Sequence, residues 1–247
     1  PYLAAFALLI LCYFWNLFRN AGRPLSWKHP LYALGILVFL ASFAYHLYAY
    51  ILRWIASGRA PLSNGHESLL WVALTVGLAG LIFEFMSRTG AAGALGSLLT
   101  AVVLGVSMMS AFDPAIGPLV PVLASYWLNI HVTIITASYG FLGLCALLGG
   151  LTLILMILTA VTRRPLGPAM AKLDHLNVQV MIVGIGLLAV GTLLGGVWAN
   201  ESWGRYWGWD PKETWALVSI LIYATILHFR WIPKLNNPYV QATGSFL

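Results

Sequence analysis

Five tryptophans fall within the eighteen residues from 198 to 215, beside a tyrosine, glycines and a dense cluster of charged side chains. Indole rings offer a flat conjugated ligand faces on which to stack, and each aromatic pair contributes about 0.5–1.5 kcal/mol beyond the area that it buries. Arg205 and Lys212 could neutralise carboxylates on such a ligand. Residues 198–215, called the tryptophan segment below, therefore predict a site for a large planar molecule. Its tryptophans are Trp198, Trp203, Trp207, Trp209 and Trp215.

The spacing within the tryptophan segment suggests how its rings are displayed. Residues three and four apart share one face of a helix, so a helical segment would place Trp203, Trp207 and Asp210 together. Gly204 and Gly208 would leave room there for a flat ligand. Two tryptophans are expected to point elsewhere, Trp198 and Trp209.

Part of the charge in the segment has a structural explanation. Asp210 before Pro211, with Glu213 three residues later, is typical of a helix start, with Asp as the N-cap, Pro at the first helical position and Glu as the capping-box partner. Two interpretations compete with a specific planar site. Tryptophans gather at membrane interfaces as anchors, although five in one segment are more than a belt needs. A quinone or another flat-ring carrier would also suit such a platform.

Composition limits the class of protein. The chain has 247 residues, of which 60% are hydrophobic and 8% charged, and its mean hydropathy is +0.85. These values predict an all-α, polytopic membrane bundle with one domain over 1–247. The net charge of +6 is spread between apolar segments, which argues against nucleic acid as a partner. Cys12 and Cys145 lack metal-ligand spacing and are expected to pack in the core.

Apolar windows long enough to cross a bilayer need ~20 residues each. Seven are expected in this chain, and the apolar last residues suggest that a longer protein would add an eighth. The chain is therefore expected to be a fragment at both ends. The windows cover about 1–18, 31–54, 67–87, 94–112, 127–160, 176–198 and 213–232.

The basic residues predict the orientation of these spans. Nine of the thirteen Lys and Arg residues fall in one set of alternate connections, which the positive-inside rule assigns to the cytoplasm. The N-terminus and the tryptophan segment are then outside. The expected span from 127 is longer than one crossing, so His131 should stand near the outer interface. The nine are Arg19, Arg23, Lys28, Arg88, Arg163, Arg164, Lys172, Arg230 and Lys234.

The tryptophan segment resembles the WWD signature of the haem-handling proteins of cytochrome c maturation, and is most similar to the CcsA/ResC branch. The resemblance rests on Trp203-Gly204-x-x-Trp207-x-Trp209-Asp210-Pro211-Lys212-Glu213-Thr214-Trp215. Further matches are Ser63-Asn64-x-x-Glu67-Ser68, Leu119-Val120-Pro121, Ser125-Tyr126-Trp127-Leu128-x-Ile130-His131-Val132, Tyr139-Gly140 and Leu227-His228-x-Arg230.

The resemblance implies a cytochrome c synthase (haem lyase) subunit that exports haem b (iron protoporphyrin IX) and presents it for thioether attachment to a C-x-x-C-H apocytochrome c. His131 would be an axial iron ligand outside and His228 a ligand within the membrane. The external haem would lie on Trp203, Trp207 and Trp209. The remaining ligands would come from outside this chain, one of them from a CcsB/ResB-like partner that is either separate or fused.

The resemblance also implies a location and alternatives. A bacterial inner membrane is expected, with the tryptophan segment on the periplasmic side, in preference to a thylakoid. A haem-delivery module of the CcmC kind would bind haem and pass it to a chaperone without attaching it. Apart from the resemblance, the tryptophans leave open a non-catalytic membrane scaffold that they merely anchor at the interface, and such a scaffold would bind no pigment. His66 is a further candidate contact, whereas His46 is expected to be a packing residue.

Overall fold

The protein is all-helical in a computed structural model, which describes residues 1–20, 23–119 and 125–247. Val120 and Pro121, which carry part of the resemblance, lie outside the described residues. The helices are α1 (Tyr2–Asn20), α2 (Pro30–Ser57), α3 (Gly65–Ser87), α4 (Ala91–Ser107), α5 (Tyr126–Thr162), α6 (Gly167–Trp203), α7 (Pro211–His228), a 3-10 turn (Phe229–Trp231) and α8 (Pro238–Phe246).

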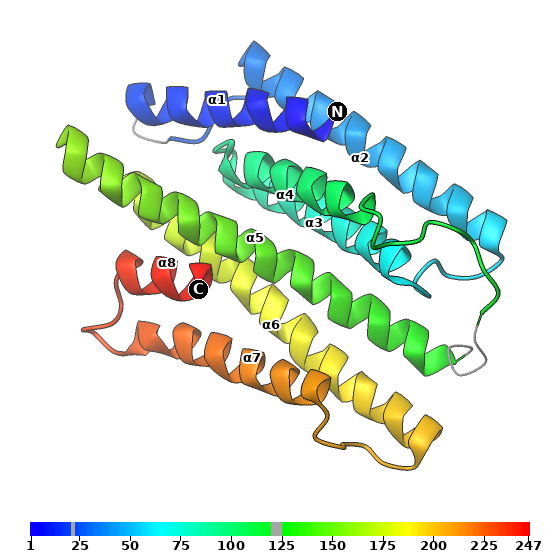
Figure 1. The fold of residues 1–247 in the computed structure, drawn as a ribbon. Helices are drawn as coiled ribbons and strands as arrows, with labels where there is room; N and C mark the ends of the chain where they lie inside the picture. Colours follow the sequence, from blue (N-terminus) through cyan, green and yellow to red (C-terminus); the bar gives the residue numbers. More distant parts are fainter. Residues whose placement is uncertain (21–22, 120–124) are drawn as a thin grey trace.

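Successive helices run in alternating directions, so that their connections gather at two ends of the bundle (Figure 1). One end holds the last turn of α1 and the segments around residues 23–30, 87–91, 162–167 and 228–238. We call it the basic end because it carries the nine Lys and Arg residues that the sequence analysis assigned to one set of alternate connections. The tryptophan segment lies at the opposite end, which we call the tryptophan end. The connections that the sequence marks as rich in Lys and Arg thus lie together at one end of the molecule.

The predicted polytopic bundle is confirmed. Within the described ranges, six helices are long and apolar enough to cross a bilayer, and α4, with seventeen residues, is a shorter apolar helix at the lower limit of a span. The expected fourth span at 94–112 was placed too far along the chain, because α4 ends at Ser107 and the residues after Met108 form turns. Hydropathy continues through Met108 and Met109, whereas the helical backbone does not.

Helices α5 and α6 each contain 37 residues and form the longest antiparallel pair in the bundle. At 1.5 Å per residue each is about 55 Å long, well beyond the ~30 Å hydrocarbon thickness. The length of α5 was expected, whereas α6 was predicted only over 176–198. Polar residues near its start, such as Lys172 and Asp174, lower the hydropathy there without breaking the helix.

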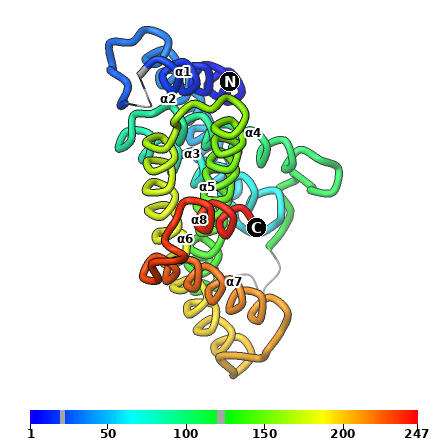
Figure 2. The backbone as a smooth tube through the Cα atoms, turned by 90° about the vertical axis from the view of Figure 1, so that its left-hand side faces the viewer, coloured from blue at the N-terminus to red at the C-terminus, as the bar shows by residue number. Residues whose placement is uncertain are grey.

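The α5–α6 pair separates two groups of helices (Figure 2). Helices α1 to α4 pack on one side, and α7 with α8 lies on the other. Glycines allow close approach: a Cβ added to Gly96 would lie 2.6 Å from the Cα of Gly80, so α3 and α4 meet almost backbone to backbone. Such small-residue contacts are the usual means of packing helices in lipid, where there is no hydrophobic force between them.

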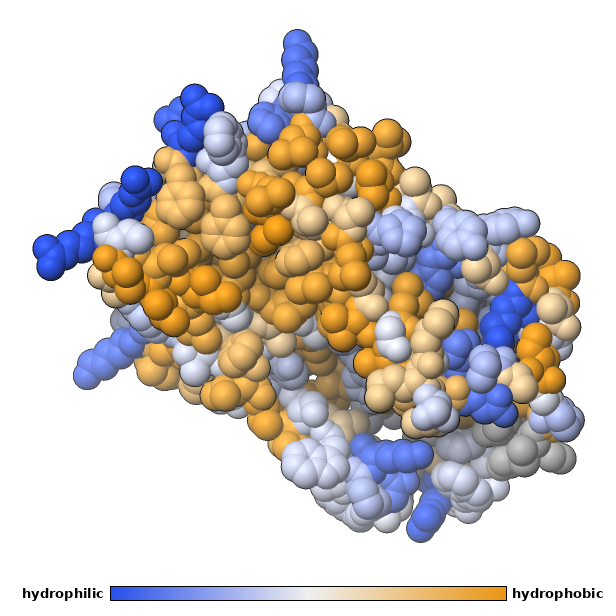
Figure 3. Space-filling model, turned by 45° about the horizontal axis from the view of Figure 1, so that its top comes forward, coloured by the Kyte–Doolittle hydropathy of each residue, from blue (hydrophilic) through white to orange (hydrophobic). Residues whose placement is uncertain are grey.

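The outer surface suits a bilayer. Hydrophobic side chains cover much of the face seen in Figure 3, and strongly hydrophilic ones project from its margins. Helix α7 is the least covered span, since only 6% of its apolar window is buried inside the chain, against 56% for α3. Most α7 side chains are therefore only partly covered, which leaves part of the helix surface to lipid or another protein.

Candidate functional site

The tryptophan segment is a helix end, a short non-helical connection and a helix start. Helix α6 ends at Trp203, and Gly204 adopts a left-handed φ of 70° that closes the helix as a C-cap. Residues 204–210 are not helical, and Trp209 has an unusual φ of 57° for a residue with a side chain. The expected helical face joining Trp203, Trp207 and Asp210 is therefore wrong. Gly204 prefers the left-handed cap to a helical turn.

The predicted capping box at the start of α7 is confirmed. The Asp210 carboxylate accepts from the Glu213 backbone N–H at 2.8 Å, while the Glu213 carboxylate accepts from the Asp210 N–H at 3.4 Å. The same Glu213 oxygen accepts from the Gly208 N–H at 2.7 Å. Glu213 thus ties the connection to the helix start, which fixes the backbone between Trp207 and Asp210.

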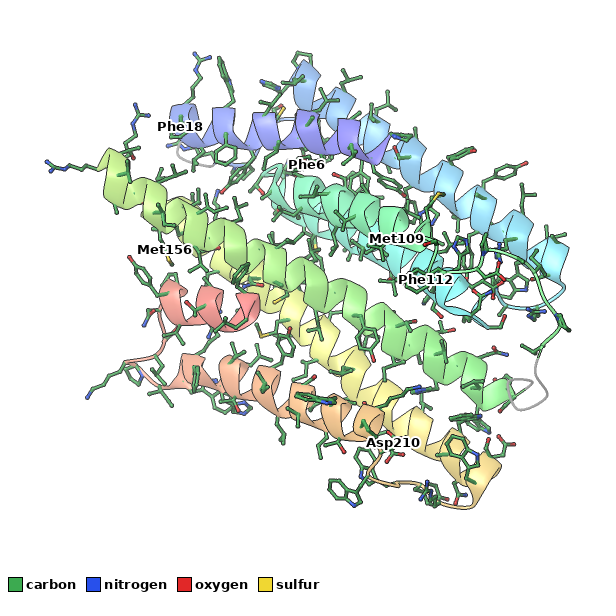
Figure 4. The ribbon with its side chains drawn as sticks, in the orientation of Figure 1. Phe6, Phe18, Met109, Phe112, Met156 and Asp210 are labelled. Atoms are coloured by element: carbon green, nitrogen blue, oxygen red, sulfur yellow. The ribbon has the colours of Figure 1, made fainter. Side chains whose placement is uncertain are left out.

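A pocket of about 680 Å³ lies between α5, α6 and the start of α7, which is within the range of ligand-binding cavities. Asp210, at the junction of the connection and α7, marks its edge (Figure 4). We call it the tryptophan pocket. Most of its lining is apolar. The predicted site residues that line it are His131, Trp198, Trp203, Trp207, Asp210 and Trp215.

The indole rings form two edge-to-face pairs. Trp198 and Trp203 have ring centroids 4.8 Å apart, and Trp207 and Trp209 have centroids 5.7 Å apart. Trp198, which was expected to point elsewhere, therefore contacts Trp203 and lines the same pocket. Trp209 is 70% exposed and supports Trp207 from outside the pocket lining. Gly204 lies outside the lining as well.

His131 enters the pocket from the second turn of α5 and is held against α6. Its Nδ1 lies 2.7 Å from the Gly191 carbonyl oxygen, which can only accept, so Nδ1 carries the proton. In the neutral ring the lone pair is then on Nε2, the atom available to a metal. A backbone carbonyl behind a histidine is the usual way in which proteins orient an imidazole ligand.

Two glycines of α6 make this arrangement of His131 fit. Gly191 and Gly195 are four residues apart and face α5, as in small-residue helix contacts. A Cβ on Gly195 would lie 2.6 Å from His131 Cε1, and a Cβ on Gly191 would lie 2.9 Å from the Cα of Ile135. These glycines are functional candidates that our sequence reasoning missed, although their spacing in the sixth span was a usable signal. Tyr139 also lines the pocket without a predicted role.

The pocket holds donors that have no acceptor. The indole Nε1 atoms of Trp198 and Trp207 are buried without a hydrogen-bond partner among the described residues. A buried unpaired N–H costs about 1–3 kcal/mol, so a molecule that brought acceptor atoms to these two indoles would relieve that cost. Lys212 adds a cation to the same lining. An apolar pocket with a histidine nitrogen, two indole donors and a cation fits a flat iron porphyrin bearing carboxylates.

His228 lies at the other end of α7, away from the tryptophan pocket. Its Nδ1 is 2.7 Å from the Ala224 carbonyl oxygen of its own helix, which leaves Nε2 as the free nitrogen. Its ring packs edge-to-face on Trp231 with centroids 4.8 Å apart, and its side chain is exposed. The structure therefore separates the two histidines proposed as iron ligands, as two distinct sites would require.

The remaining histidine and cysteine predictions can be compared with the structure. His46 is buried and lies 3.3 Å from the Tyr2 hydroxyl, which confirms packing. His66 is also buried, with Nδ1 2.8 Å from the Ser107 carbonyl oxygen, and it lies outside the lining of the tryptophan pocket. Cys12 and Cys145 are both free and buried, as expected.

Comparison with known proteins identifies relatives. The family described as Cytochrome C assembly protein matches residues 62–242, which include the whole tryptophan segment. Protein NrfI of Wolinella succinogenes is 44% identical over 198 residues, or 80% of this chain. Cytochrome c biogenesis protein CcsA of Chlamydomonas reinhardtii is 38% identical over 185 residues, or 73% of this chain. CcsA of Synechococcus sp. (strain CC9902) is 34% identical over 265 residues, or 92% of this chain.

The chain represents different shares of these relatives. It spans 22% of NrfI and 52% of the Chlamydomonas CcsA, but 82% of the Synechococcus CcsA. The expected similarity to CcsA is confirmed. The match over most of the chain, together with the helical membrane bundle, shows that this chain belongs to the Cytochrome C assembly protein family.

Proposed function

We propose that this chain acts in cytochrome c maturation, as the subunit of a cytochrome c synthase that carries haem across the membrane and presents it at the tryptophan end. The observation that carries the proposal is His131, whose Nδ1 is bonded to the Gly191 carbonyl while its ring stands in the pocket with Trp198 and Trp207. A fixed imidazole with a free Nε2 beside unpaired indole donors suits an iron porphyrin better than a quinone, which brings no metal.

Each group in the pocket has a role under this proposal. His131 Nε2 binds the haem iron and, as an axial ligand, influences its potential. The indole N–H groups of Trp198 and Trp207 donate to haem carboxylates, and Lys212 balances their charge. Trp203 and Trp215 add apolar surface along the lining. Asp210 acts indirectly, because it fixes the start of α7 and hence the position of Trp207.

The covalent step demands positioning more than acid–base chemistry. Each apocytochrome thiol adds across a haem vinyl group, so that a C–S bond forms, the C=C bond becomes single and the thiol proton ends on the neighbouring carbon. Holding both partners in register can supply about 7–11 kcal/mol of the barrier. The substrate would be haem b and an apocytochrome c with C-x-x-C-H. A pocket that is fixed by the capping box and open at the tryptophan end serves this purpose.

His228 is the basis of a proposed second haem position. It lies on the span whose apolar window is only 6% buried, with Nε2 free. A CcsB/ResB-like partner that packs on α7 would cover this surface and supply the opposing histidine. Haem would then pass from His228 to His131, from the basic end to the tryptophan end. We place the protein in a bacterial inner membrane with the tryptophan end outside.

The proposal is tested by the visible spectrum of the detergent-purified protein, prepared with its partner and adequate haem. We expect a Soret band and sharp reduced α and β bands that weaken in the His131→Ala, Trp207→Ala double variant. Trp54→Ala is the matched control, because Trp54 is an exposed tryptophan of α2 outside the tryptophan pocket. A colourless wild-type protein would contradict the proposal.

A second assay distinguishes a synthase, which attaches haem covalently, from a delivery module, which only binds haem and passes it on. We expect wild-type protein with its partner to give a haem-stained apocytochrome band on a denaturing gel, because only thioether-bound haem survives denaturation. Haem that binds the pocket yet never becomes covalently attached would point instead to a delivery module.

A further inference from the structure

A second sizeable pocket lies at the basic end and shares no lining residue with the tryptophan pocket. It has a volume of about 450 Å³ and is enclosed by α1, the end of α3 and the first turns of α6. The wall contributed by α6 includes the apolar residues Ala169, Leu173 and Leu176. No residue of this pocket has a part in the proposed handling of haem.

Tyr13 places an unpaired polar group in this pocket. The residue is only 3% exposed, it lines the pocket, and its hydroxyl has no hydrogen-bond partner among the described residues. Tyrosine hydroxyls that are buried usually find a partner, because an unpaired one carries the cost of its desolvation. The Tyr13 hydroxyl is therefore a donor that an acceptor oxygen of a bound molecule would satisfy.

Basic residues lie among the polar residues of this lining. Lys172 and His175 stand on α6, and Gln179 continues the same helix face one turn further on. The pocket lies between the second half of α1, the end of α3 and the first turns of α6, at the basic end of the bundle. Basic residues there attract the anionic lipids of the cytoplasmic leaflet, the side that the positive-inside rule assigns to this end.

We propose that this pocket binds an anionic phospholipid. Its phosphate lies by Lys172 and His175, its acyl chain lies on the apolar wall, and the Tyr13 hydroxyl donates to one of its oxygens. An anionic phospholipid matches the three features that the pocket presents, namely an apolar wall, a rim that carries the Lys172 cation, and a buried donor.

Thermal unfolding of the detergent-purified full chain tests this proposal without haem. We expect dioleoylphosphatidylglycerol to raise the Tm of the wild type, and dioleoylphosphatidylcholine to raise it less. Tyr13→Phe keeps the ring and removes only the unpaired hydroxyl, so its lipid-free Tm should equal or exceed that of the wild type. Its gain from phosphatidylglycerol should shrink. Tyr45→Phe is the control, since Tyr45 is an exposed tyrosine of α2 outside this pocket.

Native mass spectrometry gives the affinity directly. Loss of one hydrogen bond should weaken phosphatidylglycerol binding by about threefold to tenfold in Tyr13→Phe, and Lys172→Gln should weaken it further at low salt. Wild-type affinity in both variants, or equal affinity for the two lipids, overturns the proposal. Protoporphyrin that displaces phosphatidylglycerol from the wild type but binds Tyr13→Phe poorly also overturns it, and assigns the pocket to haem entry.

Discussion

The imidazole of His131 occupies the space that a side chain on Gly195 would need. A Cβ built on Gly195 lies 2.6 Å from His131 Cε1 and 2.9 Å from Nδ1, well inside contact distance. Helix α6 therefore both orients the ring, through the Gly191 carbonyl, and makes room for it. With the His131 ring in this position, only a glycine fits at residue 195.

Gly195→Ala should displace the His131 ring and weaken haem binding at the tryptophan pocket. Disturbing the support of a ligand histidine typically costs about 10–100-fold in metal affinity, and we expect a loss in this range by haem titration, with a shifted Soret maximum. Gly186→Ala is the matched control, because a Cβ on that α6 glycine meets nothing within 4 Å. Equal haem affinity in the two variants would contradict the role given to Gly195.

Asp210→Ala should destabilise the start of α7. Losing an N-cap side chain costs about 1 kcal/mol, and here it also frees the partner of a capping box. We expect a lower Tm and weaker haem binding, because the connection that carries Trp207 loses its anchor. Asp210→Asn keeps a cap acceptor and should restore most of the stability. If the asparagine and alanine variants unfold alike, the cap is not the reason for the effect.

Glu84→Ala should damage the bundle far from the tryptophan pocket. The fully buried Glu84 carboxylate accepts from the Tyr32 hydroxyl at 2.8 Å and from the backbone N–H groups of Gly90 and Gly93 at 2.7 and 3.0 Å. Each donor left unpaired costs about 1–3 kcal/mol. We expect a large fall in Tm and in membrane yield, with Tyr32→Phe having a smaller effect. A wild-type Tm for Glu84→Ala would refute this account.

Arg53→Met should loosen the loop that follows α4. Arg53 forms a 3.0 Å ion pair with the fully buried Glu67 and donates to the Pro114 carbonyl at 2.8 Å. Removing one partner of a buried pair costs about 3–5 kcal/mol, because a charge is left uncompensated. We expect lower stability and faster proteolysis near residues 113–117. Adding Glu67→Gln to Arg53→Met should recover part of the lost stability, because the unpaired buried charge is removed. If the stability losses of the two single variants simply add in the double variant, the ion pair does not contribute as stated.

Local sequence determined the class of protein and several of its helix ends. Apolar windows identified the bundle because only helices or closed barrels satisfy the backbone in lipid. The Asp210 to Glu213 pattern predicted a capping box because its hydrogen bonds join residues three apart. The basic residues marked one end because charge and span length are read directly along the chain. The tryptophan motif from Trp203 to Trp215 also indicated the family.

Tertiary structure alone decided how the site is assembled. Trp207 meets Trp209 because the chain is not helical after Gly204, and His131 meets Gly195 because α5 and α6 pack antiparallel in one register. Neither contact follows from spacing within one segment, since each depends on where a helix stops or on which turn of a neighbour lies opposite. Both long helices are apolar along most of their length, so hydropathy alone does not fix how far one is shifted along the other. The close fit of glycines against the facing helix selects it.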